Sequence, residues 1–305
     1  MSEIELRLSN VDPPDPEPKR TIYRDIVNLP DPVKLGLTIR YFNHDDVDLY
    51  FQITGSGTGY TFGTVNLGLL ASGANAYTNL DEFASRTKPS ASDLPNGEKE
   101  ENITLTLKAY TDSGYTNLKW TYERIVTVHW INSADAAFTV DVINNFDDGT
   151  VQGWAAVNEA GNSAGYPTLA VATDYVLSPQ YSLKMAQTNT TTGGIELRAR
   201  IYKSFTTPNK SKVYAIFDIR ANVSSAAQVF IQYITINEDT TILVFLGRPY
   251  VGAGTQFLPL AKWIRCVVPL PSNTTLELRV VQDWNLNSPT YVGYLWMDDF
   301  KILSK

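Results

Sequence analysis

Apolar and polar residues alternate over short stretches along most of the chain, and no long window repeats with the 3.6-residue period of a helix. β-branched and aromatic residues are concentrated in these stretches, which are separated by clusters of Gly, Pro, Asn and Asp. The pattern predicts an all-β protein. In the first half, strands are predicted at residues 33 to 42, 46 to 54, 102 to 111 and 122 to 131, a spacing typical of a β-sandwich. Only residues 80 to 87, LDEFASRT, are predicted to form a helical turn.

The second half has a denser series of predicted strands. They lie at residues 181 to 187, 195 to 206, 212 to 223, 227 to 236, 241 to 247, 263 to 270, 275 to 283 and 291 to 303. So many strands in one domain are typical of a jelly roll. The predicted strand at 138 to 143 leads into this new pattern, so we place the boundary at residue 141. The prediction is an immunoglobulin-like β-sandwich over residues 21 to 141, followed by a β jelly roll over residues 142 to 305.

Residues 1 to 20 are predicted to form an extended arm. Ile4, Leu6 and Leu8 alternate with polar residues, which is the period of a half-buried strand. The proline-rich stretch VDPPDPEPKR at 11 to 20 then acts as a spacer. A single strand must pair with the edge strand of a sheet. That edge can belong to a neighbouring copy or a particle partner, in which case the arm mediates assembly, or to the chain's own domain.

Composition and charge narrow the class of partner. Among 305 residues, 43% are apolar and 11% aromatic, enough to bury one or two cores. The 25 basic and 32 acidic residues leave a net charge of -7, which disfavours nucleic acid and anionic membranes. No apolar run reaches the roughly 18 residues of a membrane-spanning helix, so no membrane insertion is expected. No signal peptide is visible at the N-terminus. We expect the protein at a virion or extracellular surface.

The residues that usually carry catalysis are scarce. Cys266 is the single cysteine, which excludes an internal disulfide and a thiol redox pair. His44 lies in the polar turn NHDD, and His129 lies among apolar strand residues in VTVHWI. We expect no nucleophile elbow, the strand-turn-helix that presents the serine of a GxSxG motif. We therefore predict no catalytic residues and no enzyme activity.

Four segments of the second half occur in the order typical of one family. FDDGTVQGW at 146 to 154, YSLKM at 181 to 185, KWIRCVVPL at 262 to 270 and LWMDDFKIL at 295 to 303 resemble the galactose-binding-like jelly roll found in many carbohydrate-binding modules. The resemblance implies a structural calcium ion where the first and last strands meet. Its matching acids are Asp147 or Asp148 and Asp298 or Asp299. Alternatively, these acids are turn residues, since an Asp before Gly149 fits an ordinary tight turn.

Strand alternation locates a candidate ligand site, because the resemblance implies sugar binding on a concave sheet face or at its rim. In the strands around residues 195 to 202, 213 to 220, 228 to 233 and 275 to 283, polar residues are expected to form one face of a sheet whose other face is core. The loop 283 to 291 adds two aromatic side chains for stacking. The candidate ligand-binding residues are Arg198, Arg200, Asp218, Arg220, Gln232, Arg279, Trp284 and Tyr291. Alternatively, they form an ordinary solvated face with cross-strand ion pairs.

These features favour a non-catalytic carbohydrate-binding or adhesion protein displayed on a larger particle or cell surface, with a glycan or polysaccharide as partner. Two alternatives stay open. One is a structural virion component, such as a phage or archaeal-virus capsid decoration or tail protein, without sugar binding. The other is an ancillary module of a polysaccharide-degrading enzyme.

Overall fold

The chain divides into two compact units, Met1–Asp135 and Ala136–Lys305. The computed structural model describes residues 3–8, 21–27, 29–158, 167–177, 179–188, 195–223, 228–237, 244–245, 263–286 and 292–305. The division falls between residues 135 and 136 rather than at 141, so the strand predicted at 138 to 143 lies wholly in the second unit. No helix in this described part is long and apolar enough to cross a membrane.

The first unit is built from two sheets. One, the β3 sheet, has the strand order β1-β3-β7-β5, and the other, the β8 sheet, has the order β2-β9-β8-β4-β6. The strands are β1 (Ile4–Leu8), β2 (Thr21–Asp25), β3 (Val33–Asn43), β4 (Leu49–Ser56), β5 (Tyr60–Phe62), β6 (Val65–Leu70), β7 (Asn75–Arg86), β8 (Glu98–Tyr110) and β9 (Leu118–Ile131). Two short 3-10 turns, Ala91–Asp93 and Pro95–Gly97, precede β8.

The two sheets of this unit share one apolar core. Leu35 and Ile39 from β3 are fully buried, as are Phe51 from β4 and Trp130 from β9. The inward side chains alternate with solvated ones along each strand, as the sequence pattern predicts. A β-sandwich in the first unit is thereby confirmed.

The helical turn predicted at residues 80 to 87 is wrong. These residues lie mostly in β7, where Leu80 pairs with Leu37 and Ala84 pairs with Leu35 of β3. Leu80 and Ala84 are buried, and their spacing of four residues imitated a helical face. Residues four apart also share one face of a strand, so the same spacing is compatible with β7, which pairs with β3 through a register shift between Leu35 and Leu37.

The N-terminal strand pairs with a strand of its own unit. β1 pairs antiparallel with β3, from Ile4 opposite Asn43 to Leu8 opposite Ile39. The side chains of Ile4 and Leu6 are buried in the sandwich core. Of the two ways in which this strand could pair, the structure shows docking on the chain's own domain.

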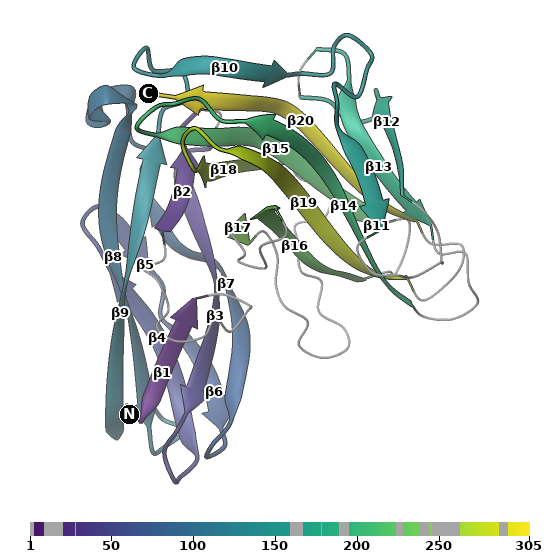
Figure 1. The fold of residues 1–305 in the computed structure, drawn as a ribbon. Helices are drawn as coiled ribbons and strands as arrows, with labels where there is room; N and C mark the ends of the chain where they lie inside the picture. The colour runs from purple at the N-terminus through teal and green to yellow at the C-terminus, as the bar shows by residue number, and fades with distance from the viewer. Residues whose placement is uncertain are drawn as a thin grey trace. The chain divides into compact units, whose positions relative to one another are not determined.

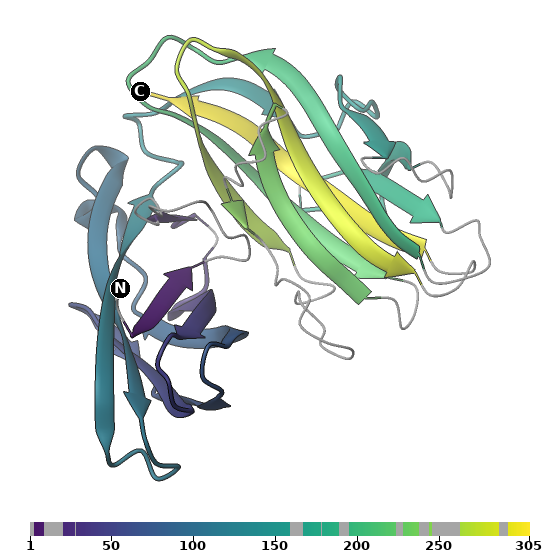
Figure 2. The same ribbon diagram turned by 60° about the horizontal axis from the view of Figure 1, so that its bottom comes forward.

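The second unit is also built from two sheets, which form two layers of long strands (Figure 2). The β20 sheet has the order β12-β13-β20-β15-β18, with β10 also paired to β20, and the β19 sheet has the order β11-β14-β19-β16-β17. The strands are β10 (Thr139–Asn144), β11 (Ala155–Asn158), β12 (Thr168–Ala172), β13 (Ser182–Thr188), β14 (Ile195–Thr206), β15 (Val213–Val223), β16 (Gln228–Ile236), β17 (Val244–Phe245), β18 (Ile264–Leu270), β19 (Thr275–Leu286) and β20 (Val292–Ser304).

The two ends of this unit lie side by side. β10 pairs antiparallel with β20, from Thr139 opposite Ser304 to Asn144 opposite Phe300 (Figure 1). One buried cluster joins the sheets, with Ile201 and Val280 from the β19 sheet packed among Phe217 and Phe300 from the β20 sheet. The all-β class, with an immunoglobulin-like sandwich followed by a jelly roll, is confirmed.

Candidate functional site

A row of polar and aromatic residues runs along the outer face of the β19 sheet. The register of β14 and β19 sets Tyr202 opposite Arg279 and Ser204 opposite Glu277. Ile201 on β14 and Leu278 and Val280 on β19 alternate with these residues and point into the core. Cross-strand partners share a face, so this row faces away from the core. We call it the polar stripe, and its members are Arg200, Tyr202, Ser204 and Thr206 on β14 and Glu277, Arg279 and Thr275 on β19.

Contacts within the polar stripe fix its charged groups. Arg279 Nε donates to Glu277 Oε1 at 2.5 Å, and Arg200 Nη2 lies 4.0 Å from the same oxygen. The guanidinium carbon of Arg200 lies 5.2 Å from the centre of the Tyr202 ring, within the range of a cation–π contact. The side chains of Arg200, Glu277 and Arg279 keep exposures of 20%, 22% and 11%. Two cations, one carboxylate and one aromatic ring are therefore held at the surface.

This arrangement suits a ligand that has both hydroxyl groups and apolar C–H surface. Charged donors and acceptors make stronger hydrogen bonds than neutral ones. Because Glu277 already orients Arg279, less side-chain entropy is lost when a ligand binds. The ring of Tyr202 offers a flat surface that costs little entropy to order. At the far end of the polar stripe, the hydroxyls of Thr206 and Thr275 are hydrogen bonded at 2.9 Å.

The structure divides the predicted ligand-binding residues between two sheets. Arg200 and Arg279 lie together in the polar stripe, whereas Asp218 and Arg220 lie on β15, which belongs to the β20 sheet. The expectation of one shared face is therefore wrong for Asp218 and Arg220. Alternation along a strand reveals which residues share a side, but the choice of sheet depends on long-range pairing, here of β15 with β18 and β20.

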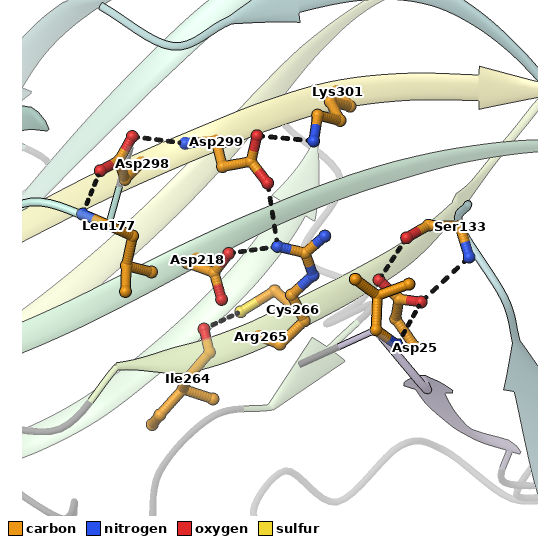
Figure 3. Close-up of polar contacts among 11 residues, drawn as sticks. Asp25, Ser133, Leu177, Asp218, Ile264, Arg265, Cys266, Asp298, Asp299 and Lys301 are labelled. Carbon is orange, nitrogen blue, oxygen red and sulfur yellow. Dashed lines mark hydrogen bonds and ion pairs between the residues drawn. The ribbon is translucent and has the colours of Figure 1, made fainter. Parts of the chain in front are cut away.

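Asp218 is part of an ion-pair cluster on the β20 sheet (Figure 3). Arg265 Nη1 contacts Asp218 Oδ2 and lies 3.1 Å from Asp299 Oδ2, and Asp299 Oδ1 lies 2.7 Å from Lys301 Nζ. The side chains of Asp218 and Arg265 are each only 9% exposed. Each carboxylate of this cluster therefore already faces at least one cation.

Four predicted residues fall wholly or partly outside the described residues. Tyr291 is outside, and so are the side chains of Arg198, Gln232 and Trp284. Their backbone register is described for β14, β16 and β19. Arg198 pairs with Asp283, and Gln232 pairs with Gln282, whose side chain is fully buried.

Two residues of this region did not emerge from the sequence pattern. Tyr202 follows Arg200 by two positions, so continuing the same alternation by one step would have found it. Lys203 points to the other side of β14, where its Nζ donates to Asn144 Oδ1 and to the Gln152 carbonyl, both at 2.7 Å. Burial lowers the pKa of Lys203. Only the folded arrangement could show that this lysine secures the start of the second unit.

Of the four acids expected to bind calcium, two contact the same segment of the chain and two do not. Asp147 Oδ1 accepts the Gln180 N–H at 3.1 Å. Asp298 Oδ2 accepts the Leu177 N–H at 2.7 Å, as Figure 3 shows. The carboxylate of Asp298 is completely buried, and its Oδ1 accepts the Asp299 N–H at 2.7 Å. Asp147 and Asp298 therefore both contact the chain just before β13.

The other two acids are engaged elsewhere. Asp148 Oδ1 accepts the N–H and the hydroxyl of Thr150, both at 2.9 Å, and these bonds lower the pKa of Asp148. Asp299 belongs to the ion-pair cluster with Arg265 and Lys301. Among the described residues, no group of three His, Cys, Asp or Glu side chains is arranged to hold a metal. Hard carboxylate oxygens from Asp147 and Asp298 fit calcium in kind, and backbone carbonyls would have to complete the shell.

Comparison with known proteins gives structural matches alone. No family model and no curated protein matches the chain. Among solved structures, the chain is similar to a carbohydrate-binding module of the β-sandwich superfamily (13% identity, 89% of this chain and 93% of that chain, TM-score 0.37). It is also similar to a xylan-binding domain from Paenibacillus barcinonensis (16%, 54% and 93%, TM-score 0.33) and to the K3 adhesin domain of Lys-gingipain from Porphyromonas gingivalis W83 (12%, 54% and 100%, TM-score 0.37).

The likeness to carbohydrate-binding modules expected from the sequence is thus found among solved structures. Both the identities and the TM-scores are low. The fold assignment above rests on the strand order of this chain, and the proposals below rest on its own side chains.

Proposed function

We propose that this protein binds carbohydrate, without catalysis, through the polar stripe of the β19 sheet. One observation carries the proposal: Arg200, Tyr202, Glu277 and Arg279 form one connected, partly exposed group on the outer face of two paired strands. Rigid strands hold such a group more precisely than loops do. Its combination of ring, cations and carboxylate matches the C–H surface and hydroxyl groups of a pyranose.

The sugar would contact the polar stripe in two ways. A pyranose ring would lie against Tyr202, where its C–H groups replace water on the aromatic face. Its hydroxyls would donate to Glu277 and accept from Arg279. The shared carboxylate of Glu277 would keep both arginines in place while the sugar exchanges with water.

The arrangement of both histidines is consistent with binding alone. His44 Nε2 lies 3.4 Å from Glu5, and His129 lies 3.3 Å from Glu98 and 3.0 Å from Glu100. A carboxylate on an imidazole fixes its orientation, and hydrolysis by the usual route would need a nucleophile at the other nitrogen of that imidazole.

The proposal is tested with a glycan array probed by the full chain, followed by calorimetric titration with the best oligosaccharide. We expect Tyr202→Ala and Arg279→Ala to weaken binding at least tenfold. Lys210→Ala removes a positive charge from an exposed turn of the same unit and should leave binding unchanged. Thermal melts of all variants verify that they remain folded.

Two results would contradict the proposal. One is the absence of binding to every glycan on the array. The other is wild-type affinity in both stripe variants, which would place the sugar elsewhere on the chain.

A further inference from the structure

A second group of aromatic and charged side chains lies on the outer face of the β20 sheet, across the sandwich from the polar stripe. Trp296 on β20 is the Cα partner of both Lys184 on β13 and Arg220 on β15. The residues on either side of Trp296 point into the core, so these three side chains share the outer face. Tyr294 lies on the same face, two positions before Trp296. We call Lys184, Arg220, Tyr294 and Trp296 the tryptophan row.

The rings and cations of the tryptophan row contact one another. The rings of Tyr294 and Trp296 are 5.4 Å apart and inclined by 30°. Lys184 Nζ lies 4.9 Å from the first ring and 5.1 Å from the second. Trp296 is almost fully buried, whereas Tyr294 is half-buried and keeps part of its ring at the surface.

The chain before β13 covers one end of the tryptophan row. Tyr175 meets the Trp296 ring edge-on at 4.9 Å. Asp174 accepts a hydrogen bond from Lys184 Nζ at 2.5 Å and another from Trp296 Nε1 at 3.1 Å. Burial acts to raise the pKa of Asp174, but these two hydrogen bonds outweigh it and the pKa is lowered. Asp174 is thus a fixed carboxylate that orients Lys184.

Arg220 is held by stacking on Tyr175. Its guanidinium carbon lies 3.8 Å from the centre of the Tyr175 ring. Its Nε is buried and has no hydrogen-bond acceptor among the described residues. A buried donor without an acceptor is costly, and a guanidinium stacked through its face still presents N–H groups at its edge. Arg220 as a whole is only partly buried, so a ligand would meet the Nη groups at the edge of the guanidinium rather than the buried Nε.

The charges indicate which acceptor is suitable. The tryptophan row holds two cations, Lys184 and Arg220, and the carboxylate that contacts it, Asp174, pairs with Lys184. Asp298, two positions after Trp296, accepts the N–H groups of Leu177 and Asp299. The neighbouring acids Asp218 and Asp299 are paired with Arg265. Arginine binds carboxylates in a two-pronged geometry that lysine cannot reproduce. An acidic group carried by a ring that can rest on Tyr294 is therefore the complementary ligand.

We infer that the tryptophan row is a second binding site, and that its ligand is a saccharide bearing a carboxylate, a hexuronate unit. The carboxylate pairs with Arg220, and the sugar ring lies against the exposed part of Tyr294. This site is independent of the polar stripe, because the two occupy opposite faces of one sandwich. A chain with both sites can bridge two polysaccharide strands, which raises its avidity without any new contact.

The probe is tri-galacturonate, with its methyl ester as the uncharged control, titrated into the full chain by calorimetry. The wild type should bind the acid at least tenfold more tightly than the ester. Arg220→Gln and Tyr294→Ala should each weaken binding of the acid at least tenfold, while Tyr202→Ala in the polar stripe should leave it unchanged. Arg220→Lys retains the charge but loses the fork geometry, so it should bind less tightly than the wild type.

Each outcome of this titration either supports or overturns the assignment. It is overturned if tri-galacturonate fails to bind, if acid and ester bind equally, or if Tyr202→Ala abolishes binding while Tyr294→Ala does not. The last result would place the acidic sugar on the polar stripe and would leave the proposed function intact. Melting curves exclude unfolding as the cause of a loss, and Tyr294→Ala provides a second reading should Arg220→Gln fail to fold.

Discussion

Trp154 meets the ring of Phe300 edge-on, with centroids 5.1 Å apart and planes at 83°. Trp154 ends the opening motif of the second unit, and Phe300 belongs to the closing strand β20, so this contact joins segments from the two ends of the unit. Both side chains are buried. Phe205 and Phe217 pack against the same Phe300 ring at 6.1 and 5.9 Å, which makes Phe300 the centre of the aromatic core.

Replacing Phe300 with Ala should therefore destabilise the second unit strongly. Truncating a fully buried phenylalanine costs about 3–5 kcal/mol through lost burial and the cavity left behind. Chemical denaturation of the full chain measures the loss. The exposed turn residue Asn209 provides the control, since Asn209→Ala should change stability by less than about 0.5 kcal/mol. A similar small change for Phe300→Ala would contradict its central position.

Calcium should stabilise the second unit through Asp147 and Asp298. We expect a higher melting temperature in calcium than in chelator, since a ligand that binds only the folded state stabilises it by mass action, about 2.7 kcal/mol at a hundred times its Kd. Asp147→Asn should remove this difference. Asp148→Asn should preserve it, because Asp148 bonds to Thr150. Identical melts of the wild type in calcium and chelator would refute the metal site.

Asp45 should make the stability of the first unit sensitive to acid. Hydrogen bonds from Lys119 and the Trp120 indole N–H hold the pKa of Asp45 far below its usual value. The stabilisation is complete above the unfolded-state pKa of about 4 and is lost as pH falls below it toward the folded-state pKa. Denaturation at a series of pH values should show a constant gap between wild type and Asp45→Asn above about pH 5 and a shrinking gap below about pH 4.

The control for this pH series is Glu123→Gln, which removes a carboxylate from an exposed position on β9. Its stability should follow that of the wild type across the range. A gap between wild type and Asp45→Asn that stays unchanged into strong acid would mean that the carboxylate of Asp45 contributes nothing through its charge.

The buried face of β1 should stabilise the first unit. Leu6 is completely buried and pairs with Tyr41 on β3. Leu6→Ala should cost about 2–5 kcal/mol, as expected for a core leucine, whereas the exposed Glu3→Ala should have little effect. Denaturation and sedimentation are measured together. If Leu6→Ala instead changes the oligomeric state at unaltered stability, β1 pairs with another copy in solution.

The amino-acid sequence located most of the long strands and the direction of their side chains, but it missed β6, β7, β11 and β12. Alternation alone located β14 at residues 195 to 206 and separated Arg200 from its buried neighbours. Such patterns are local, because successive side chains of a strand point to opposite faces whatever the strand pairs with. The motifs at 146 to 154 and 295 to 303 also indicated that the two ends of the second unit meet, as β10 and β20 do.

Tertiary pairing decided which sheet each strand joins, and this determined the make-up of both candidate sites. β15 has the same alternation as β14, yet it pairs with β18 and β20 and carries Arg220 to the opposite face of the sandwich. There Arg220 meets Tyr175 and Trp296, which are far from it in sequence. Pairing between distant strands depends on the complementarity of whole faces and on bulges such as that beside Asp218, and no short stretch of sequence encodes these by itself.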